Sequence, residues 1–419
     1  MKSINSLRGT CDILPDEMKY WHFIEKKASC LLANANYTEI RTPIIEQKEL
    51  FARGVGLETD IVNKEMYSFE DQGKRQITLR PEGTAGITRS FIEHKLYSDK
   101  PSYKFWYKGA MFRYERPQSG RQRQFHQLGV ECLGIKDARI DAEVISLAYN
   151  FLTSIGIKEL SLEINTIGSK LDRKKYEAKL VNYLQVYYQE LDSDSQKRLN
   201  KNPLRILDSK NRNTQKILNK APLLFDEVND NSKQHFEILC IYLNALKIPY
   251  VINYKLVRGL DYYNDTAFEF KTSLLGGQDT LCGGGRYDNL IEELGGPNTP
   301  AIGWAIGIER LLLLLKQKIH INNEQLDVYI VSDNSIRCKV ESIIMFNKLR
   351  HENIKVDMDQ TNSTIRKKIK RAYKLQSRYC LIIGEEEIKK GKITLKNLTT
   401  NNDETINAHL EMAINSILT

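Results

Sequence analysis

Two neighbouring segments, 103–115 and 125–134, alternate polar and apolar side chains across a polar loop, RPQSGRQRQ. Every second side chain of a strand shares a face, so Gln127 and Glu131 lie together and Arg113 projects from the partner strand. One interpretation is a half-exposed sheet with a wet side. The other is a polar pocket floor, in which Arg113 is a fixed cation for phosphate or carboxylate.

The loop between these segments adds three arginines, Arg116, Arg121 and Arg123. A solvated loop tip explains them, and so does a mobile basic loop that closes over a phosphate-rich ligand. The segment TLRPEGTAG (78–86) predicts a strand that ends at a proline, followed by small residues that open a helix. Backbone N–H groups at such a turn suit anions, and Glu82 could hold an ammonium group. A plain turn with a solvated carboxylate is the alternative.

Three further segments combine arginine with glycine or tyrosine. LVRGLDYYND (256–265) sets Arg258 near two tyrosines, whose rings suit a flat hydrogen-bonding ligand or a half-buried strand. The glycine-rich CGGGRYDNL (282–290) is weak evidence alone. In AIGWAIGIER we predict a helix over 301–315 that places Gly303, Gly307 and Arg310 on one face. Helix packing explains the glycines but not the arginine. The flat glycine surface with an arginine at its end suggests a ligand whose planar group lies on the glycines, with an anion above it.

The elements that position these residues follow from periodicity. We predict a helix over 16–35 and a strand over 37–45, in which Pro43 indicates an edge or an interface. Residues 169–234 have helical spacing and read as an inserted module, after which strands return at 255–270. Beyond the polar joint QKIHINNEQ, the chain alternates strands and helices from residue 327.

Composition limits the class of protein. A chain of 419 residues with net charge +9 predicts two to four domains and permits a polyanionic partner. No apolar run suits a membrane helix or a signal peptide, which predicts a cytoplasmic protein without a membrane partner. The seven cysteines are scattered, with no C-x-x-C, so neither disulfides nor a protein metal site is expected.

Together the segments resemble the class II aminoacyl-tRNA synthetases, and specifically the histidyl-tRNA synthetases of the compact bacterial type. The helix and strand with Pro43 resemble the first class motif, residues 112–134 the second, and GIER (307–310) the third. LVRGLDYY (256–263) and GGGRYD (283–288) are similar to signatures of the histidine enzymes. The likeness covers nearly the whole chain, with the motifs in the family's order.

The resemblance implies an α+β fold with an antiparallel catalytic core in two parts, 1–168 and 246–318. A helical insertion would span 169–245, and an α/β anticodon-binding domain 326–419. It implies ATP as a substrate, Mg²⁺, L-histidine, histidine tRNA and a homodimer. No editing domain is needed, because a site that hydrogen-bonds the imidazole rejects ligands without such groups.

Residue roles are carried over from the same resemblance. ATP would bind Arg113 at the α-phosphate, Arg310 at the γ-phosphate, and Glu115, while Arg258 would face the α-phosphate where the histidine carboxylate attacks. Three fixed arginines with Mg²⁺ would neutralise the charge of the transition state. The histidine-binding residues would be Glu82, Gly83, Thr84, Gln127, Glu131, Tyr262, Tyr263 and Tyr287. The residues that would contact tRNA are Arg116, Gln118, Arg121 and Arg123, with Lys367, Lys368 and Lys370 of the basic run RKKIKRAYK (366–374).

Two other functions remain open at this point. A synthetase-like regulatory subunit that binds histidine would resemble the core, but it typically lacks the C-terminal domain and a complete Arg258 segment. A pure nucleic-acid-binding module is the other, although +9 over 419 residues is dilute.

Overall fold

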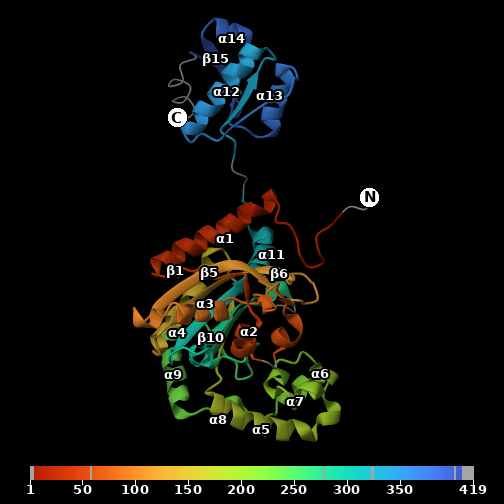
Figure 1. Ribbon diagram of the computed structural model, residues 1–419, viewed down its shortest axis with the longest axis vertical. Coiled ribbons are helices and arrows are strands. Elements are labelled where there is room, and N and C mark those ends of the chain that lie inside the picture. Colours follow the sequence, from red (N-terminus) through yellow and green to blue (C-terminus); the bar gives the residue numbers. More distant parts are fainter. Residues whose placement is uncertain (1–3, 57–58, 277–278, 322–324, 401–402, 408–419) are drawn as a thin grey trace. The chain divides into compact units, whose positions relative to one another are not determined.

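The computed structural model describes residues 4–56, 59–276, 279–321, 325–400 and 403–407 (Figure 1). The chain divides into two compact units, Met1–Ile321 and Asn322–Thr419, and each is considered by itself.

The first unit is built on an eight-stranded sheet in the order β1-β5-β6-β11-β10-β9-β7-β8. Its central strands are antiparallel, and only the outer pairs β1–β5 and β7–β8 run parallel. The strand bounds are β1 Thr38–Glu39, β5 Tyr103–Phe112, β6 Gln124–Leu133, β7 Ser161–Thr166, β8 Val251–Ile252, β9 Asn264–Lys271, β10 Thr280–Arg286 and β11 Ala301–Gly307. The two alternating segments thus form the predicted hairpin, β5–β6.

Two apolar layers cover the two faces of this sheet. On one face Trp106, Val130 and Trp304 pack beneath the helices α1 (Pro15–Asn34), α4 (Ala138–Ser154), α9 (Asp230–Ala245) and α11 (Ile308–Lys318). On the other face Phe105 and Tyr107 meet α2 (Lys48–Val55), α3 (Thr84–Glu93), α10 (Leu290–Glu293) and the insertion. The strand period of two produces this division.

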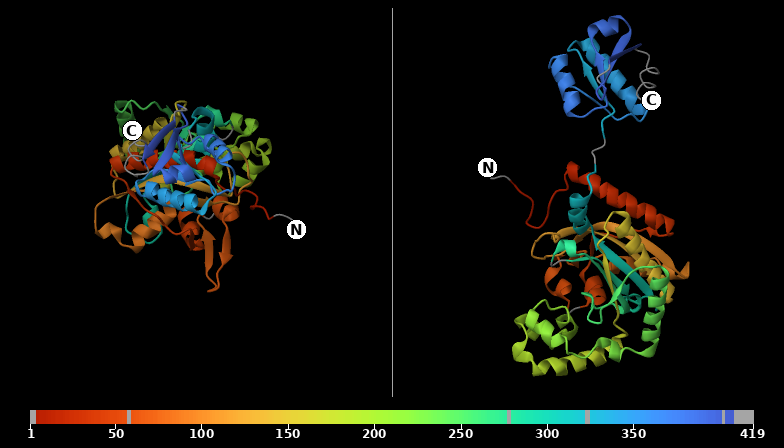
Figure 2. Two further views of the ribbon diagram at one scale, coloured as in Figure 1. Left: turned by 90° about the horizontal axis from the view of Figure 1, so that it is seen from above. Right: turned by 180° about the vertical axis from the view of Figure 1, so that it is seen from behind.

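The insertion consists of one long helix and several short ones on the side of the sheet away from α1 (Figures 1 and 2). It begins at a capping box, in which Ser169 and Asp172 bond each other's backbone N–H groups. Its helices are α5 Lys170–Val186, η3 Tyr188–Glu190, α6 Ser193–Arg198, η4 Pro203–Ile206, α7 Arg212–Leu218 and α8 Leu224–Glu227. The predicted helical module is therefore present, and α9 returns the chain to the sheet.

A three-stranded sheet, β2-β4-β3, stands apart from the large one. It contains β2 Ile45–Gln47, β3 Ser68–Glu70 and β4 Gln76–Leu79. The predicted strand over 37–45 was wrong in extent: β1 ends at Glu39, and β2 starts only at Ile45. Pro43 lies between them, where it cannot donate to a ladder. The remaining short helices are η1 Ile61–Glu65, η2 Leu96–Ser98 and η5 Ser273–Leu275.

The second unit is the predicted α/β domain, with a five-stranded sheet in the order β13-β12-β14-β15-β16. Strands β12 (Val328–Ser332), β13 (Val356–Met358) and β14 (Tyr379–Ile383) are parallel and alternate with α12 (Ile336–His351) and α13 (Ile365–Lys374). After α14 (Glu385–Lys389), β15 (Lys392–Asn397) and β16 (Asp403–Asn407) add an antiparallel edge.

The predicted helix over 301–315 was wrong in its first half. Residues Ala301–Gly307 are the buried strand β11, and the helix α11 starts at Ile308. The segment alternates small and large residues, with Ile302, Trp304 and Ile306 on one face, which is a strand period. Within the described ranges, no helix combines the length and apolar character that a membrane span requires.

Candidate active site

A cavity of about 230 Å³ opens on the sheet face that carries Tyr107. Strands β6, β10 and β11, the start of α3 and the loop before β9 all contribute to its wall. It brings together most of the site residues expected from the sequence: Glu82, Thr84, Arg113, Glu115, Arg121, Gln127, Glu131, Arg258, Tyr262, Tyr263, Tyr287 and Arg310.

Of the residues expected in the first unit, four do not line this cavity. Gly83 lies just before α3, where an added Cβ would come within 2.3 Å of the Tyr107 ring. Gln118 forms a bridge with Arg121 at the loop tip, and the Arg123 guanidinium stacks 3.8 Å from the Tyr114 ring centroid. Arg116 belongs to the same loop.

The buried carboxyl group of Glu131 lies in the cavity wall and is surrounded by polar side chains. Its carboxylate, 1% exposed, accepts a 2.6 Å hydrogen bond from the Thr84 hydroxyl and a second from the Tyr287 hydroxyl. Burial raises the pKa of Glu131 to about 8, against the opposing effect of these two hydrogen bonds. The carboxylate is thus fixed, desolvated and suited to a ligand that donates an N–H.

Gly303 creates the space that Glu131 occupies. The two residues are direct neighbours across β6 and β11, and a Cβ on Gly303 would lie 1.8 Å from Glu131 Oε2. The absence of a side chain at Gly303 therefore leaves room for a carboxylate on the adjacent strand. The interpretation from the sequence, in which this glycine flattens a helix face, was wrong.

Glu82 has a narrower role than a free carboxylate at a turn. Its two oxygens accept hydrogen bonds from the backbone N–H groups of Thr84 (2.7 Å) and Ala85 (2.8 Å), so it caps α3. Beside it, Gln127 Oε1 and the Tyr107 hydroxyl are buried and have no hydrogen-bond partner within the described ranges. Buried polar atoms normally find a partner, and since Gln127 lines the cavity, its Oε1 suits a polar group of a ligand.

The cavity wall is also rich in arginine. Arg113 donates to the Pro81 carbonyl (2.9 Å) and lies 5.1 Å from the Phe125 ring centroid, and Arg310 donates to the Thr280 carbonyl (2.6 Å). Burial, followed by the positive charge of Arg121, lowers the pKa of Arg310. A phosphate group bound here would relieve that repulsion.

Arg258 is held by an ion pair that sequence reasoning missed. It pairs with Glu269 of β9, and a Cβ on Gly283 would lie 2.2 Å from its guanidinium. Burial opposes the charged form of Arg258, but the combined effect of Glu269, Tyr263 and Tyr262 raises its pKa. The signal was present in the sequence, because Glu269 interrupts the otherwise apolar AFEF of a buried strand.

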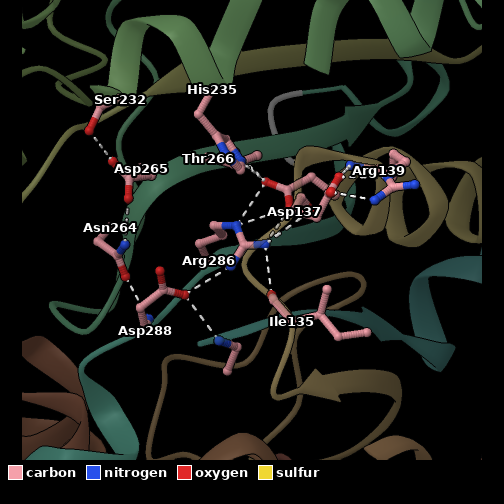
Figure 3. Close-up of polar contacts among 12 residues, drawn as sticks. Ile135, Asp137, Arg139, Ser232, His235, Asn264, Asp265, Thr266, Arg286 and Asp288 are labelled. Carbon is pink, nitrogen blue, oxygen red and sulfur yellow. Dashed lines mark hydrogen bonds and ion pairs between the residues drawn. The ribbon is translucent and has the colours of Figure 1, made fainter. Parts of the chain in front are cut away.

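A buried polar network around Arg286 fixes the ends of β9 and β10 (Figure 3). Arg286, 1% exposed, bonds Asp141 of α4 at 2.7 Å and Asp288 at 3.0 Å. Asp141 also accepts from Thr266 (2.6 Å) and contacts His235 Nε2 of α9 (2.9 Å). Since Arg286 precedes Tyr287 directly, this network fixes the backbone from which the Tyr287 hydroxyl reaches Glu131.

The basic run of the second unit lies on α13, and one of its lysines faces inward. Lys368 is 1% exposed and donates to the Ser332 carbonyl at 2.8 Å, so the expectation that it contacts tRNA was wrong. Arg371 is held by Asp359 at 2.6 Å. Lys367 and Lys370 remain exposed.

Comparisons with known proteins agree with this geometry. The family model described as histidyl-tRNA synthetase matches residues 9–311, and the anticodon binding domain matches residues 325–418. The chloroplastic histidine–tRNA ligase of Porphyra purpurea is 53% identical over 406 residues, covering 97% of this chain and 94% of the relative. The histidine–tRNA ligase of Cyanothece sp. is 50% identical with the same coverage. The crystal structure of apo Staphylococcus aureus histidyl-tRNA synthetase superimposes with a TM-score of 0.81 at 40% identity, covering 98% of this chain and 99% of that one.

Proposed function

The chain belongs to the histidyl-tRNA synthetase family, and we propose that its cavity forms histidyl-adenylate from L-histidine and ATP before transfer to histidine tRNA. It is a class II histidine–tRNA ligase with a C-terminal anticodon-binding domain. The alternative of a regulatory subunit gains no support from relatives of about half identity, which are named as ligases over nearly the full length.

The single observation that carries the proposal is the polarity of one cavity. The same cavity wall holds a buried carboxylate with two hydroxyl donors and the arginines Arg113, Arg258 and Arg310. Histidine differs from other amino acids in a ring with two nitrogens, and Glu131 with the surrounding Tyr262, Tyr263 and Tyr287 suits it. Gln127 and Glu82 would receive the amino group, with Thr84 beside them.

ATP would bind against the arginines of the cavity wall. Arg113 and Arg258 would flank the α-phosphate and Arg310 would bind the γ-phosphate, so that charge is neutralised as the histidine carboxylate attacks in line. Within the described residues there is no group of three or more side chains that could hold a metal ion. Mg²⁺ typically binds through phosphate oxygens and one or two carboxylates, and Glu115, 3.9 Å from Arg113, is the carboxylate placed to contribute. The ion would supply further charge neutralisation.

The overall reaction is tested by aminoacylation. Purified protein with ATP, Mg²⁺ and a histidine tRNA transcript should attach histidine to that tRNA, and a non-cognate transcript should remain uncharged. Charging of neither transcript would contradict the proposal.

We further propose a homodimer and a cytoplasmic location. Support for the dimer comes from β2 and β3, which expose Ile45 (52%) and Phe69 (45%) next to the segment that resembles the first class motif. Sedimentation equilibrium should give twice the chain mass.

Glu131→Gln is expected to stabilise the ligand-free protein at alkaline pH while weakening histidine binding. The folded-state pKa of about 8 exceeds the ordinary value of 4.5, so wild-type stability falls as pH rises between these values. Glutamine does not ionise, and its advantage should therefore grow across this window to on the order of 3 kcal/mol. Urea unfolding at pH 5 and pH 8.5 measures it.

The exposed Glu93→Gln serves as the control for Glu131→Gln, since its side chain is 58% exposed. Its stability should follow wild type at both pH values. Parallel pH profiles for Glu131→Gln and wild type, or unchanged histidine Km in the variant, would contradict the assignment.

Replacing Lys367 and Lys370 together with alanine should raise the Km for tRNA and flatten its salt dependence. Their exposed positions on α13 suit phosphate contacts, which make affinity salt-dependent. ATP–pyrophosphate exchange without tRNA should not change. The matched control is Lys389→Ala with Lys390→Ala, an exposed pair at the end of α14. Equal effects of the two double variants would mean that α13 contributes only net charge.

A further inference from the structure

The loop that carries Arg258 has an irregular backbone between β8 and β9. Residues 253–263 contain neither helix nor strand, so their carbonyl groups need hydrogen-bond donors from elsewhere. Among the described residues, three side chains donate to three of these carbonyls. Asn165 of β7 donates to the Leu256 carbonyl at 2.9 Å, and the other two donors are arginines.

Both arginines belong to the helical insertion. Arg205 of η4 donates from Nη2 to the Gly259 carbonyl at 2.5 Å, and Arg173 of α5 donates from Nη1 to the Tyr263 carbonyl at 2.5 Å. The first carbonyl follows Arg258 directly, and the second belongs to a tyrosine of the cavity wall. The insertion thus holds the loop on both sides of Leu260–Tyr262.

The hydrogen bonds to the Gly259 and Tyr263 carbonyls are the main contacts of the two guanidinium groups. Neither Arg173 nor Arg205 forms an ion pair with a described residue, although burial lowers the pKa of Arg173 against the opposing charges of Glu177 and Asp261. Gly259 allows the close approach, because a Cβ there would lie 3.2 Å from Arg205 Nη1. Partly buried guanidinium groups lose hydration, and their hydrogen bonds to these carbonyls compensate for that loss while fixing the backbone of the loop.

We infer that Arg205 and Arg173 are positioning residues for adenylate formation, acting through the backbone of the Arg258 loop. The insertion is then part of the activation site and not only an appendage to it. Arg258 reaches the cavity through a narrow space between Glu269 and Gly283, so a small shift of its backbone misplaces the guanidinium. Misplacement by about 1 Å can cost roughly 10²-fold in rate.

The inference rests on the proposed function and is tested by histidine-dependent ATP–pyrophosphate exchange without tRNA. Arg205→Met should lower kcat by roughly 10–100-fold while the Km values for ATP and histidine stay within about threefold. Arg205→Lys, which can still donate to the Gly259 carbonyl, should recover part of the loss. A second cavity is lined by Arg173, Arg205 and Lys201. Lys201→Ala, which removes a cation from its wall, should leave exchange unchanged.

A double-mutant cycle separates positioning from general structural support. Arg205→Met should cost much less on an Arg258→Ala background than on wild type, because the loop then has no guanidinium to place. Full additivity, or wild-type kcat in Arg205→Met, would overturn the inference. Wild-type protein without histidine-dependent exchange would instead refute the proposed function, so the two failures are distinguishable.

Discussion

Arg258→Ala is expected to slow histidine-dependent adenylate formation by roughly 10²–10³-fold with little change in histidine affinity. The guanidinium is preorganised by Glu269 and by the space at Gly283, so it needs no rearrangement when charge develops at the α-phosphate. Pre-steady-state measurement of adenylate formation, together with calorimetric titration of histidine, separates the two effects.

The control for this variant is Arg75→Ala, which removes an arginine that is 76% exposed. It should react like wild type. Arg258→Ala also leaves Glu269 with Lys271 at 3.7 Å as its remaining cation, so unfolding must be measured in parallel. Near-normal turnover in a folded Arg258→Ala variant would show that Arg258 supports the loop and does not stabilise the transition state.

Gly303→Ala is expected to reduce kcat/Km for histidine by at least about 10²-fold. The new methyl group would lie 1.8 Å from Glu131 Oε2 and 2.4 Å from the Val130 carbonyl, so the carboxylate must leave its place between Thr84 and Tyr287. A misplaced buried acceptor loses its discrimination for a ligand that donates an N–H.

Gly307→Ala is the matched control in the same strand. No atom lies within 4 Å of the Cβ position at Gly307, so the protein itself can accommodate the methyl group. The histidine Km should stay close to wild type in this variant. If kcat/Km for histidine fell equally in Gly303→Ala and Gly307→Ala, the imidazole ring would have to bind elsewhere than beside Glu131.

The hairpin and the C-terminal domain could be predicted because their periodicity is local. Strand pairing across 103–115 and 125–134 follows from alternation and a turn-rich loop, and the α/β pattern after residue 327 follows from strands and helices in succession. The resemblance to the family predicts most of the cavity residues from the sequence alone. Gln127 and Glu131 do lie in one cavity wall, as their spacing of four along a strand predicts.

The errors arose where long-range partners decide the structure. Gly303 and Gly307 fit a helix face at i and i+4, but an added Cβ at Gly303 would meet Glu131 on a neighbouring strand. The inward turn of Lys368 depends on the Ser332 carbonyl, 36 residues earlier in the chain. The contacts of Arg173 and Arg205 with the Arg258 loop likewise join segments that no local pattern connects.

In the proposed function, one cavity recognises histidine and activates it with ATP. The most direct measurement is ATP–pyrophosphate exchange by the purified protein, without tRNA, in the presence of each of the twenty amino acids in turn. Histidine should support exchange at least about 10³-fold better than any other amino acid, because ligands without the imidazole offer the buried Glu131 carboxylate no ring N–H. Exchange that ignores histidine, or that another amino acid supports better, would contradict the account.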